Sequence, residues 1–413
     1  MLLESLGIFI FCILFIYLLL CAYIKIKFQF WSMQPVFHIY DFMYWIKPPG
    51  RISYELPAIN KYVNLVDIKT TKLDSINDTD ITHVCNFIKS YYLQNNRVKY
   101  LPNKSNIIGF LESSNYPSYI TIYKKPKMLF DKNNNDLLAP SMYIDEYISI
   151  ITARILHITL KGIKTIPLYY IDNLCVHQDH RKKGIAPEMI ATHYYNMSRL
   201  ERKVVTYLFK REGELNAIIP LTTFITRGYD ISPFSFMPFP IGSVSLIEIT
   251  KKNISLFMHF IHQHNKFDCI ILPEISNIQH LLKLENIYIY VIIQNKELIS
   301  IYVFKKQSVW FTCNTSTSTS SQKYQTIDCI ASLYMNALSS DIFIIGFNQA
   351  LQQIGKRDNT IKRIMIENTS HNATIIEYAK RINIRIICEY PSAFFLYNYG
   401  CYSYQPSECF FIY

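Results

Sequence analysis

The chain has 413 residues, of which 50% are hydrophobic, 15% aromatic and 18% charged. This length allows about two or three compact units with a sizeable core, and the composition excludes a disordered or fibrous protein. The formal net charge of +11 favours anionic partners such as phosphates, CoA-like cofactors, acidic lipid or nucleic acid, without choosing among them. None of the ten cysteines forms a C-x-x-C pair, so nothing supports a zinc ribbon or a redox motif.

The chain begins with a strongly apolar segment. Leu6 to Ile24 contains 19 residues and no charge, close to the roughly 20 residues that a helix needs to cross a bilayer. We therefore predict an N-terminal transmembrane anchor over residues 1–30, with a cleaved signal peptide as the alternative. Lys25 and Lys27 follow the segment, and the positive-inside tendency then predicts a single-pass membrane protein whose body faces the cytoplasm.

Residues 31–79 form a connecting segment that is rich in aromatic residues and proline. The part from Gln34 to Gly50 is aromatic enough to lie at the level of the lipid headgroups. Packing of the same part against the body of the protein is an equally good interpretation.

Regular structure is predicted from residue 80 onward. Asp80 is expected to cap a helix whose apolar residues recur with helical spacing as far as Tyr92. Pro187 is expected in the first turn of a second helix. Strands are predicted from β-branched and aromatic runs at residues 119–123, 147–160, 166–177 and 204–209.

A proline-rich stretch from Ser232 to Pro240 is the best internal boundary, and it divides the body into residues 80–235 and 236–413. The second half has predicted helices at residues 253–264, 325–338 and 372–380, and predicted strands at residues 244–249, 287–294, 298–304 and 342–345. The order of elements predicts an α+β fold made of two successive units of similar size.

The segment with the clearest chemistry runs from Ile171 to Pro187, and reads I-D-N-L-C-V-H, Q-D-H and R-K-K-G-I-A-P. It joins an apolar strand, a basic turn and the start of a helix. Backbone N–H groups at a helix N-terminus converge on an anion, and Gly184 permits close approach. The cations before the glycine are Arg181, Lys182 and Lys183. The segment therefore predicts a site for the pyrophosphate of an adenine nucleotide or CoA, with a solvated basic turn as the alternative.

The string R-K-K-G-I-A resembles the R/Q-x-x-G-x-G/A pyrophosphate loop of the GNAT superfamily of N-acetyltransferases. The longer string from residue 171 resembles eukaryotic N-myristoyltransferase, whose pattern is I-N-F-L-C-V-H, a short basic turn and V-A-P. The resemblance extends weakly over residues 80–413, where Glu367-Asn368 and Phe395 to Tyr399 are similar to the closing region of that family. It implies tandem GNAT-like halves, the first binding acyl-CoA and the second supplying much of a peptide groove.

The resemblance also implies an activity and a site. It implies a glycylpeptide N-tetradecanoyltransferase that transfers myristoyl from myristoyl-CoA to the N-terminal glycine of a protein, with no metal. Backbone amides of Asn173 and Leu174 would form an oxyanion hole for the thioester carbonyl. The other residues implied to contact myristoyl-CoA are Cys175, Val176, Arg181, Lys182, Lys183, Gly184, Ile185, Ala186 and Pro187.

In this family the base is the terminal α-carboxylate, which here belongs to Tyr413. Desolvation in a dry groove would bring its pKa closer to that of the glycine ammonium. An ordinary final strand is the alternative interpretation of this end of the chain. Where the family has an acidic cluster for a basic substrate residue, this chain has Y-L-Q-N-N-R at residues 92–97, so that site is absent.

Two other functions compete with this one. A GNAT enzyme that acetylates a small amine or polyamine needs only the pyrophosphate turn. A catalytically inactive, membrane-anchored homologue that binds acyl-CoA needs only the fold. The predicted partners are acyl-CoA, a peptide with an N-terminal glycine and a membrane, with no nucleic acid, and the predicted oligomeric state is a monomer.

Overall fold

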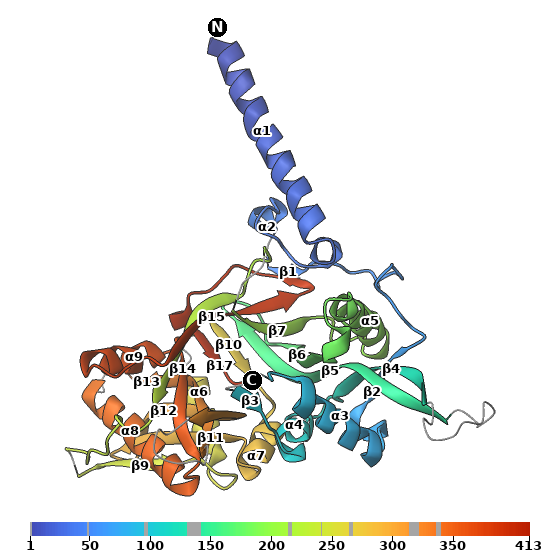
Figure 1. Ribbon diagram of the computed structural model, residues 1–413. Coiled ribbons are helices and arrows are strands. Elements are labelled where there is room, and N and C mark those ends of the chain that lie inside the picture. Colours follow the sequence, from blue (N-terminus) through green and yellow to red (C-terminus); the bar gives the residue numbers. More distant parts are fainter. Residues whose placement is uncertain are drawn as a thin grey trace.

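The computed structural model describes residues 2–47, 49–94, 98–129, 142–213, 217–240, 242–263, 267–313, 322–335 and 340–413. Its helices are α1 (Leu2–Lys27), α2 (Met43–Ile46), α3 (Asp78–Tyr91), α4 (Lys104–Leu111), α5 (Ile185–Leu200), α6 (Ile254–Gln263), α7 (Ile275–Lys283), α8 (Ser340–Arg357) and α9 (Asn372–Arg381). Figure 1 shows α1 projecting alone from a body in which the other helices surround a large sheet.

Within the described residues, fifteen strands form one mixed sheet. They are β2 (Ile68–Lys72), β3 (Val98–Tyr100), β4 (Tyr119–Leu129), β5 (Met142–Leu160), β6 (Ile166–Val176), β7 (Tyr207–Glu212), β8 (Thr222–Asp230), β9 (Val244–Glu248), β10 (Cys269–Leu272), β11 (Ile287–Gln294), β12 (Glu297–Cys313), β13 (Gln322–Tyr334), β14 (Ile361–Glu367), β15 (Cys388–Tyr397) and β17 (Cys409–Phe411). The main path runs β17-β10-β5-β6-β7-β15-β8-β14-β13-β12-β11-β9. A separate ribbon pairs β1 (Gly50–Arg51) with β16 (Tyr399–Gly400).

The sheet contains the same local unit twice. Strands β6 and β7 are parallel neighbours joined through α5, and β13 and β14 are parallel neighbours joined through α8. Between the two units lie β15 and β8. The C-terminal strand β17 and strand β10 lie beside β5 instead, so late segments of the chain complete the sheet next to the first unit. The fold is therefore mixed α+β, as the sequence predicts.

The central strands are buried on both faces, which explains the first of two wrong predictions. Residues 325–338 were expected to be helical, but 325–334 belong to β13, and 336–338 lie outside the described residues. Ile327 of this strand packs into one apolar cluster and Ile330 into another on the opposite face. A strand that is apolar on both faces loses its period-two pattern, so periodicity alone cannot separate it from a buried helix.

The second wrong prediction is the strand at residues 342–345. This run lies inside α8, and Ile342, Phe343 and Ile344 are all buried there. A short apolar run is compatible with either a strand or a helix. Here the run is part of a helix of 18 residues, and length is what separates the two elements. The predicted cap of the first helix is also shifted, because Asn77 accepts the Asp80 backbone N–H at 2.7 Å, whereas Asp80 binds Lys124.

Helix α1 is long and apolar enough to cross a membrane between Glu4 and Lys27, by length and composition, although a signal sequence near an N-terminus passes the same test. Only 6% of its most apolar window is buried against the body. The short helix α2 lies near the C-terminal end of α1 (Figure 1). The hydroxyl of Tyr17 in α1 donates to the carbonyl of Tyr40 in the segment between them.

Candidate functional site

Strands β6 and β7 separate part of the way along their length. Their parallel pairing covers residues 169–171 of β6 and 207–209 of β7. Beyond Ile171, β6 continues with β5 as far as Val176, whereas β7 continues with β15. The backbone of β6 beyond Ile171 is therefore not paired with β7.

A β-bulge lies at the point where the strands part. Ile150 of β5 pairs with Cys175 and Thr152 pairs with Asp172, so two residues of β6, Asn173 and Leu174, lie opposite one residue of β5. Asn173 has a positive φ of 52°. A bulge leaves a residue out of the regular ladder and redirects the chain, which is typical of sites where backbone groups contact a ligand.

The N–H of Asn173 already has an acceptor. It donates to Asp172 Oδ1 at 2.7 Å, and the Asn173 side-chain amide donates to Thr152 Oγ1 at 3.0 Å. To act as an oxyanion donor, this N–H would have to exchange the carboxylate for the thioester oxygen. Among the described residues, no side chain accepts from the N–H of Leu174, so this donor has no side-chain bond to exchange.

The basic turn leads from the bulged strand into α5. Gly184 precedes the helix with φ 80°, and Lys182 also has a positive φ of 62°. A Cβ built at Gly184 would meet no atom within 4 Å, so backbone conformation and not packing accounts for glycine here. The first N–H groups of a helix have no partner within the helix, and α5 directs its own toward this turn.

Arg181 holds the turn in place. Its Nε donates to the carbonyl of Val176 at 3.1 Å, and its Nη2 donates to the carbonyl of Tyr91 at the end of α3. Lys182 and Lys183 are exposed. The three predicted cations therefore divide into one that ties the turn to α3 and two that add positive charge at the surface.

A cavity of about 460 Å³ lies between the turn and the end of α3. Nine of the predicted cofactor residues line it, namely Leu174, Cys175, Val176, Arg181, Lys182, Gly184, Ile185, Ala186 and Pro187. Asn173 and Lys183 are not among its lining residues. Tyr91, Tyr92, Leu93 and His180 also line it. No motif marks the first three as cofactor residues, because the end of α3 is distant in sequence, whereas His180 lies within the segment from Ile171 to Pro187 but was not predicted to contact the cofactor. Residues 95–97 of the Y-L-Q-N-N-R string lie outside the described residues.

Cys175 and His177 lie on or next to the bulged strand. Burial raises the pKa of the Cys175 thiol to about 12, so the thiolate that a nucleophile requires is not formed near neutral pH. His177 caps the short 3-10 helix after β6 by accepting the Asp179 backbone N–H on Nδ1. Its ring lies 4.2 Å from the ring of Tyr91. Both residues are held by structural contacts.

The last residue of the chain is inside the protein. Strand β17 is parallel to β10, which pairs with β5, and Tyr413 is 2% exposed. Its ring packs edge-on against Tyr170 of β6 and Phe394 of β15. The chain terminus therefore lies between the bulged strand and the strands of the second unit.

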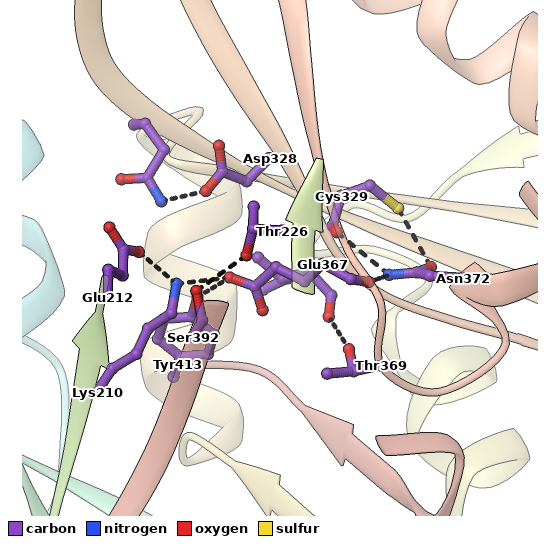
Figure 2. A network of polar contacts seen from close by, with 12 residues as sticks. Lys210, Glu212, Thr226, Asp328, Cys329, Glu367, Thr369, Asn372, Ser392 and Tyr413 are labelled. Atoms are coloured by element: carbon purple, nitrogen blue, oxygen red, sulfur yellow. Dashed lines mark hydrogen bonds and ion pairs between the residues drawn. The ribbon is translucent and has the colours of Figure 1, made fainter. Parts of the chain in front are cut away.

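An ionic network fixes the side chain of Tyr413 (Figure 2). Its hydroxyl donates to Glu367 Oε1, which also accepts from Lys210 Nζ at 2.7 Å. The same Nζ binds Glu212 at 2.7 Å and lies 5.3 Å from the centre of the Tyr413 ring. Burial alone would lower the pKa of Lys210, but Glu367, Tyr413 and Glu212 hold it well above its usual value, so the ammonium stays charged.

Glu367 is oriented by the start of α9. The Asn372 side-chain amide donates to the backbone carbonyls of Glu367 at 2.8 Å and Cys329 at 3.2 Å, and its oxygen accepts from Ser332 (Figure 2 shows Asn372 beside both strands). These bonds hold the end of β14 against β13. The buried Glu367 carboxylate, which accepts from the Tyr413 hydroxyl, is consequently held in position by β13, β14 and α9.

Solved structures of one enzyme have this fold. A crystal structure of Saccharomyces cerevisiae N-myristoyltransferase with bound myristoyl-CoA matches with a TM-score of 0.66 and 13% identity, covering 91% of this chain and 94% of that chain. Two further structures of the yeast enzyme, one with bound myristoyl-CoA and one with myristoyl-CoA and inhibitors, match with TM-scores of 0.66 and 14% identity. They cover 91% of this chain and 89% and 91% of theirs.

No protein-family model matches the sequence, and no curated protein matches it. The fold likeness nonetheless confirms the resemblance that the I-D-N-L-C-V-H and R-K-K-G-I-A-P strings indicated: the chain has the fold of N-myristoyltransferase. Across the described ranges, no group of three or more His, Cys, Asp or Glu side chains is arranged to hold a metal ion.

Proposed function

We propose that the protein is an N-acyltransferase that moves the myristoyl group of myristoyl-CoA to the N-terminal glycine of a protein. The observation that carries the proposal is the cavity that the end of β6, the basic turn and the start of α5 line together with the end of α3. The crystal structures with the same fold are of an N-myristoyltransferase with bound myristoyl-CoA.

The cavity suits the phosphates of CoA for electrostatic reasons. Free N–H groups at the start of α5, the glycine conformation at Gly184 and the exposed cations Lys182 and Lys183 together favour a polyanion. Arg181 supports the turn, and its bonds to two backbone carbonyls give it a positioning role in this proposal.

Acyl transfer would take place near the bulge. The glycine amine attacks the thioester carbonyl, the C–S bond breaks, and CoA leaves as the thiol after taking up a proton. Backbone N–H groups of Asn173 and Leu174 would stabilise the oxyanion, with about 3 to 4 kcal/mol for an essential donor. The carboxylate of Tyr413 would accept the proton of the glycine ammonium, and the burial of this residue supports that role.

The repeated β–α–β unit supports our proposal of tandem GNAT-like halves at residues 80–235 and 236–413. We also propose that residues 1–30 anchor the protein in a membrane, with residues 31–79 as the connecting segment. The connecting segment after α1 exposes large apolar side chains, which supports contact with lipid: Met33, Ile39, Phe42, Met43, Trp45 and Ile46. Lys25 and Lys27 at the end of α1 support a body on the cytoplasmic side. Protease added to intact vesicles should then digest the body, and a protected body would refute the orientation.

The proposed activity is tested in two steps with the full-length protein in detergent. A non-hydrolysable myristoyl-CoA analogue should raise the melting temperature, whereas the matching acetyl-CoA analogue should not. Myristoyl-CoA and a glycine-initiated peptide should then give acylated peptide and free CoA. Consumption of acetyl-CoA would favour a GNAT acetyltransferase, and analogue binding without product would favour an inactive homologue.

A chain extended by a few residues beyond Tyr413 tests the proposed base. The extension moves the carboxylate out of the interior, so turnover should be lost while binding of the myristoyl-CoA analogue remains. Undiminished turnover of the extended chain would exclude the terminal carboxylate as the base.

A further inference from the structure

Within the described ranges, a buried arginine next to the proposed transfer point has no ionic partner. Arg154 of β5 is 3% exposed, and neither terminal nitrogen of its guanidinium has a hydrogen-bond partner among the described residues. The guanidinium lies against two aromatic rings, 5.0 Å from the centre of Phe110 and 5.5 Å from that of Tyr170. Aromatic faces attract a cation but do not satisfy its N–H donors, so a buried charge remains uncompensated.

A second cation lies on the same ring. Lys305 of β12 is 8% exposed, and its Nζ is 5.2 Å from the centre of Phe110 and 4.3 Å from that of Tyr413. Within the part of the chain that the structure describes, no carboxylate lies within 4 Å of Lys305 or Arg154. Two positive charges that share one aromatic ring repel each other, and burial increases that repulsion.

The nearest acids of the described ranges do not form an ion pair with either cation. Asp328 lies opposite Lys305 on the neighbouring strand; its Oδ2 accepts from the side chain of Gln307, and its Oδ1 has no hydrogen-bond partner among the described residues. Asp172 accepts the Asn173 N–H through Oδ1. Among the described residues, both terminal nitrogens of Arg154 therefore remain without an acceptor, beside a second buried cation.

The position of this pair relates it to the acyl acceptor. Arg154 of β5 pairs directly with Tyr170 of β6. Tyr170 lies two residues before Asp172, where the bulge begins. Because side chains two residues apart on a strand point to the same face, Tyr170 and Asp172 share a face of β6. Lys305 contacts the ring of Tyr413, the residue whose carboxylate is the proposed base. Any group bound by these cations would therefore lie beside the reacting amine.

We propose that Arg154 and Lys305 form a binding site for a carboxylate that the acyl acceptor carries close to its N-terminal amine. A guanidinium binds a carboxylate through two parallel hydrogen bonds, and an ammonium beside it adds a second charge-assisted bond. The inference rests on the proposed function, because it names the class of peptide that the transferase accepts: a glycine-initiated sequence with an acidic residue near its start.

The test measures peptide binding to the full-length protein in detergent, saturated with the non-hydrolysable myristoyl-CoA analogue. Glycine-initiated peptides carry Asp at the second, third or fourth position, and matched peptides carry Asn there. At one position at least, Asp should improve affinity by about tenfold or more. A glycyl dipeptide with a free or an amidated C-terminus shows whether a main-chain carboxylate can replace the side chain.

Variants assign the preference to the cations. Arg154→Met should abolish the Asp preference, and Lys305→Met should reduce it. Lys306→Met is the matched control, because Lys306 is the next residue of β12 and pairs with Asp358 at 2.8 Å; it should leave the preference intact. Because Arg154→Met removes an uncompensated buried charge, the melting temperature should stay or rise, whereas a structural arginine would lower it.

The outcomes separate the two proposals. Peptide binding with no Asp preference, or a preference that persists in Arg154→Met, overturns the carboxylate site and leaves the proposed function standing. Binding of the analogue with no glycine-initiated peptide bound in any form overturns the acceptor, and with it both proposals.

Discussion

Lys210 offers a comparison of a buried and an exposed ion pair on one nitrogen. Its Nζ lies 2.7 Å from Glu367 Oε1 and 2.7 Å from Glu212 Oε1, yet the side chain of Glu367 is 1% exposed and that of Glu212 is 50% exposed. Removing one partner of a buried pair leaves an uncompensated charge and costs about 3 to 5 kcal/mol. An exposed pair is worth about 0.2 to 1 kcal/mol, because water screens it.

Glu367→Gln should therefore lower the free energy of unfolding by about 3 to 5 kcal/mol and Glu212→Gln by less than about 1 kcal/mol. Urea unfolding of the full-length protein in detergent at pH 7 measures both, with tryptophan fluorescence as the signal and the slopes compared to confirm a common transition. Equal losses from the two variants would refute the argument that burial decides the strength of these pairs. Glu367→Gln should also loosen Tyr413, so acyl transfer should fall while analogue binding remains.

The other predictions concern the turn, the cation pair and the cysteine. Gly184→Ala places an L-residue at φ 80°, so it should lower the free energy of unfolding by about 1 to 2 kcal/mol and weaken myristoyl-CoA binding. Gly162→Ala, at φ 72° in the turn before β6, should lower the free energy of unfolding by as much and leave binding unchanged. Equal effects of the two variants on binding would refute the role of the turn. Burial lowers the pKa of Lys305 to about 8, so this lysine is charged below that pH and neutral above it. The ratio of the affinities for an Asp peptide and its Asn counterpart should therefore fall between pH 7 and 9 in binding titrations, because the N-terminal ammonium titrates alike in both peptides. Cys175→Ala should keep acyl transfer within about twofold, because a buried thiol with a pKa of about 12 supplies no thiolate; loss of turnover with normal binding would contradict this.

Local patterns in the sequence predict those elements whose ends carry turn or helix-start residues. The strand predicted at residues 287–294 coincides with β11, and the helix predicted from Pro187 lies within α5. The basic turn and its cavity could be predicted because the glycine, the cations and the helix start are adjacent in sequence. Nine of the residues implied for the cofactor line one cavity for the same reason.

Long-range contacts could not be predicted in this way. Tyr91 reaches the cavity because Arg181, ninety residues later, binds its carbonyl. Arg154 and Lys305 come together on the ring of Phe110 from β5, β12 and α4, and no local pattern marks any of the three. The helix predicted where β13 lies and the strand predicted within α8 were both wrong, because burial on several sides removes the periodicity that distinguishes strand from helix.

The position of Tyr413 depends on the second unit as much as on the first. Strand β17 enters the sheet beside β10, which pairs with β5, while Glu367 at the end of β14 receives the Tyr413 hydroxyl. The terminus can therefore reach the neighbourhood of the bulge only after β10, β14 and β17 have joined the sheet. Because these contacts join residues far apart in the chain, they form late relative to local structure. A partly folded chain could then bind CoA phosphates at the turn before it has an interior site for an acceptor, so acyl transfer should require the complete sheet whereas phosphate binding should depend on the first unit.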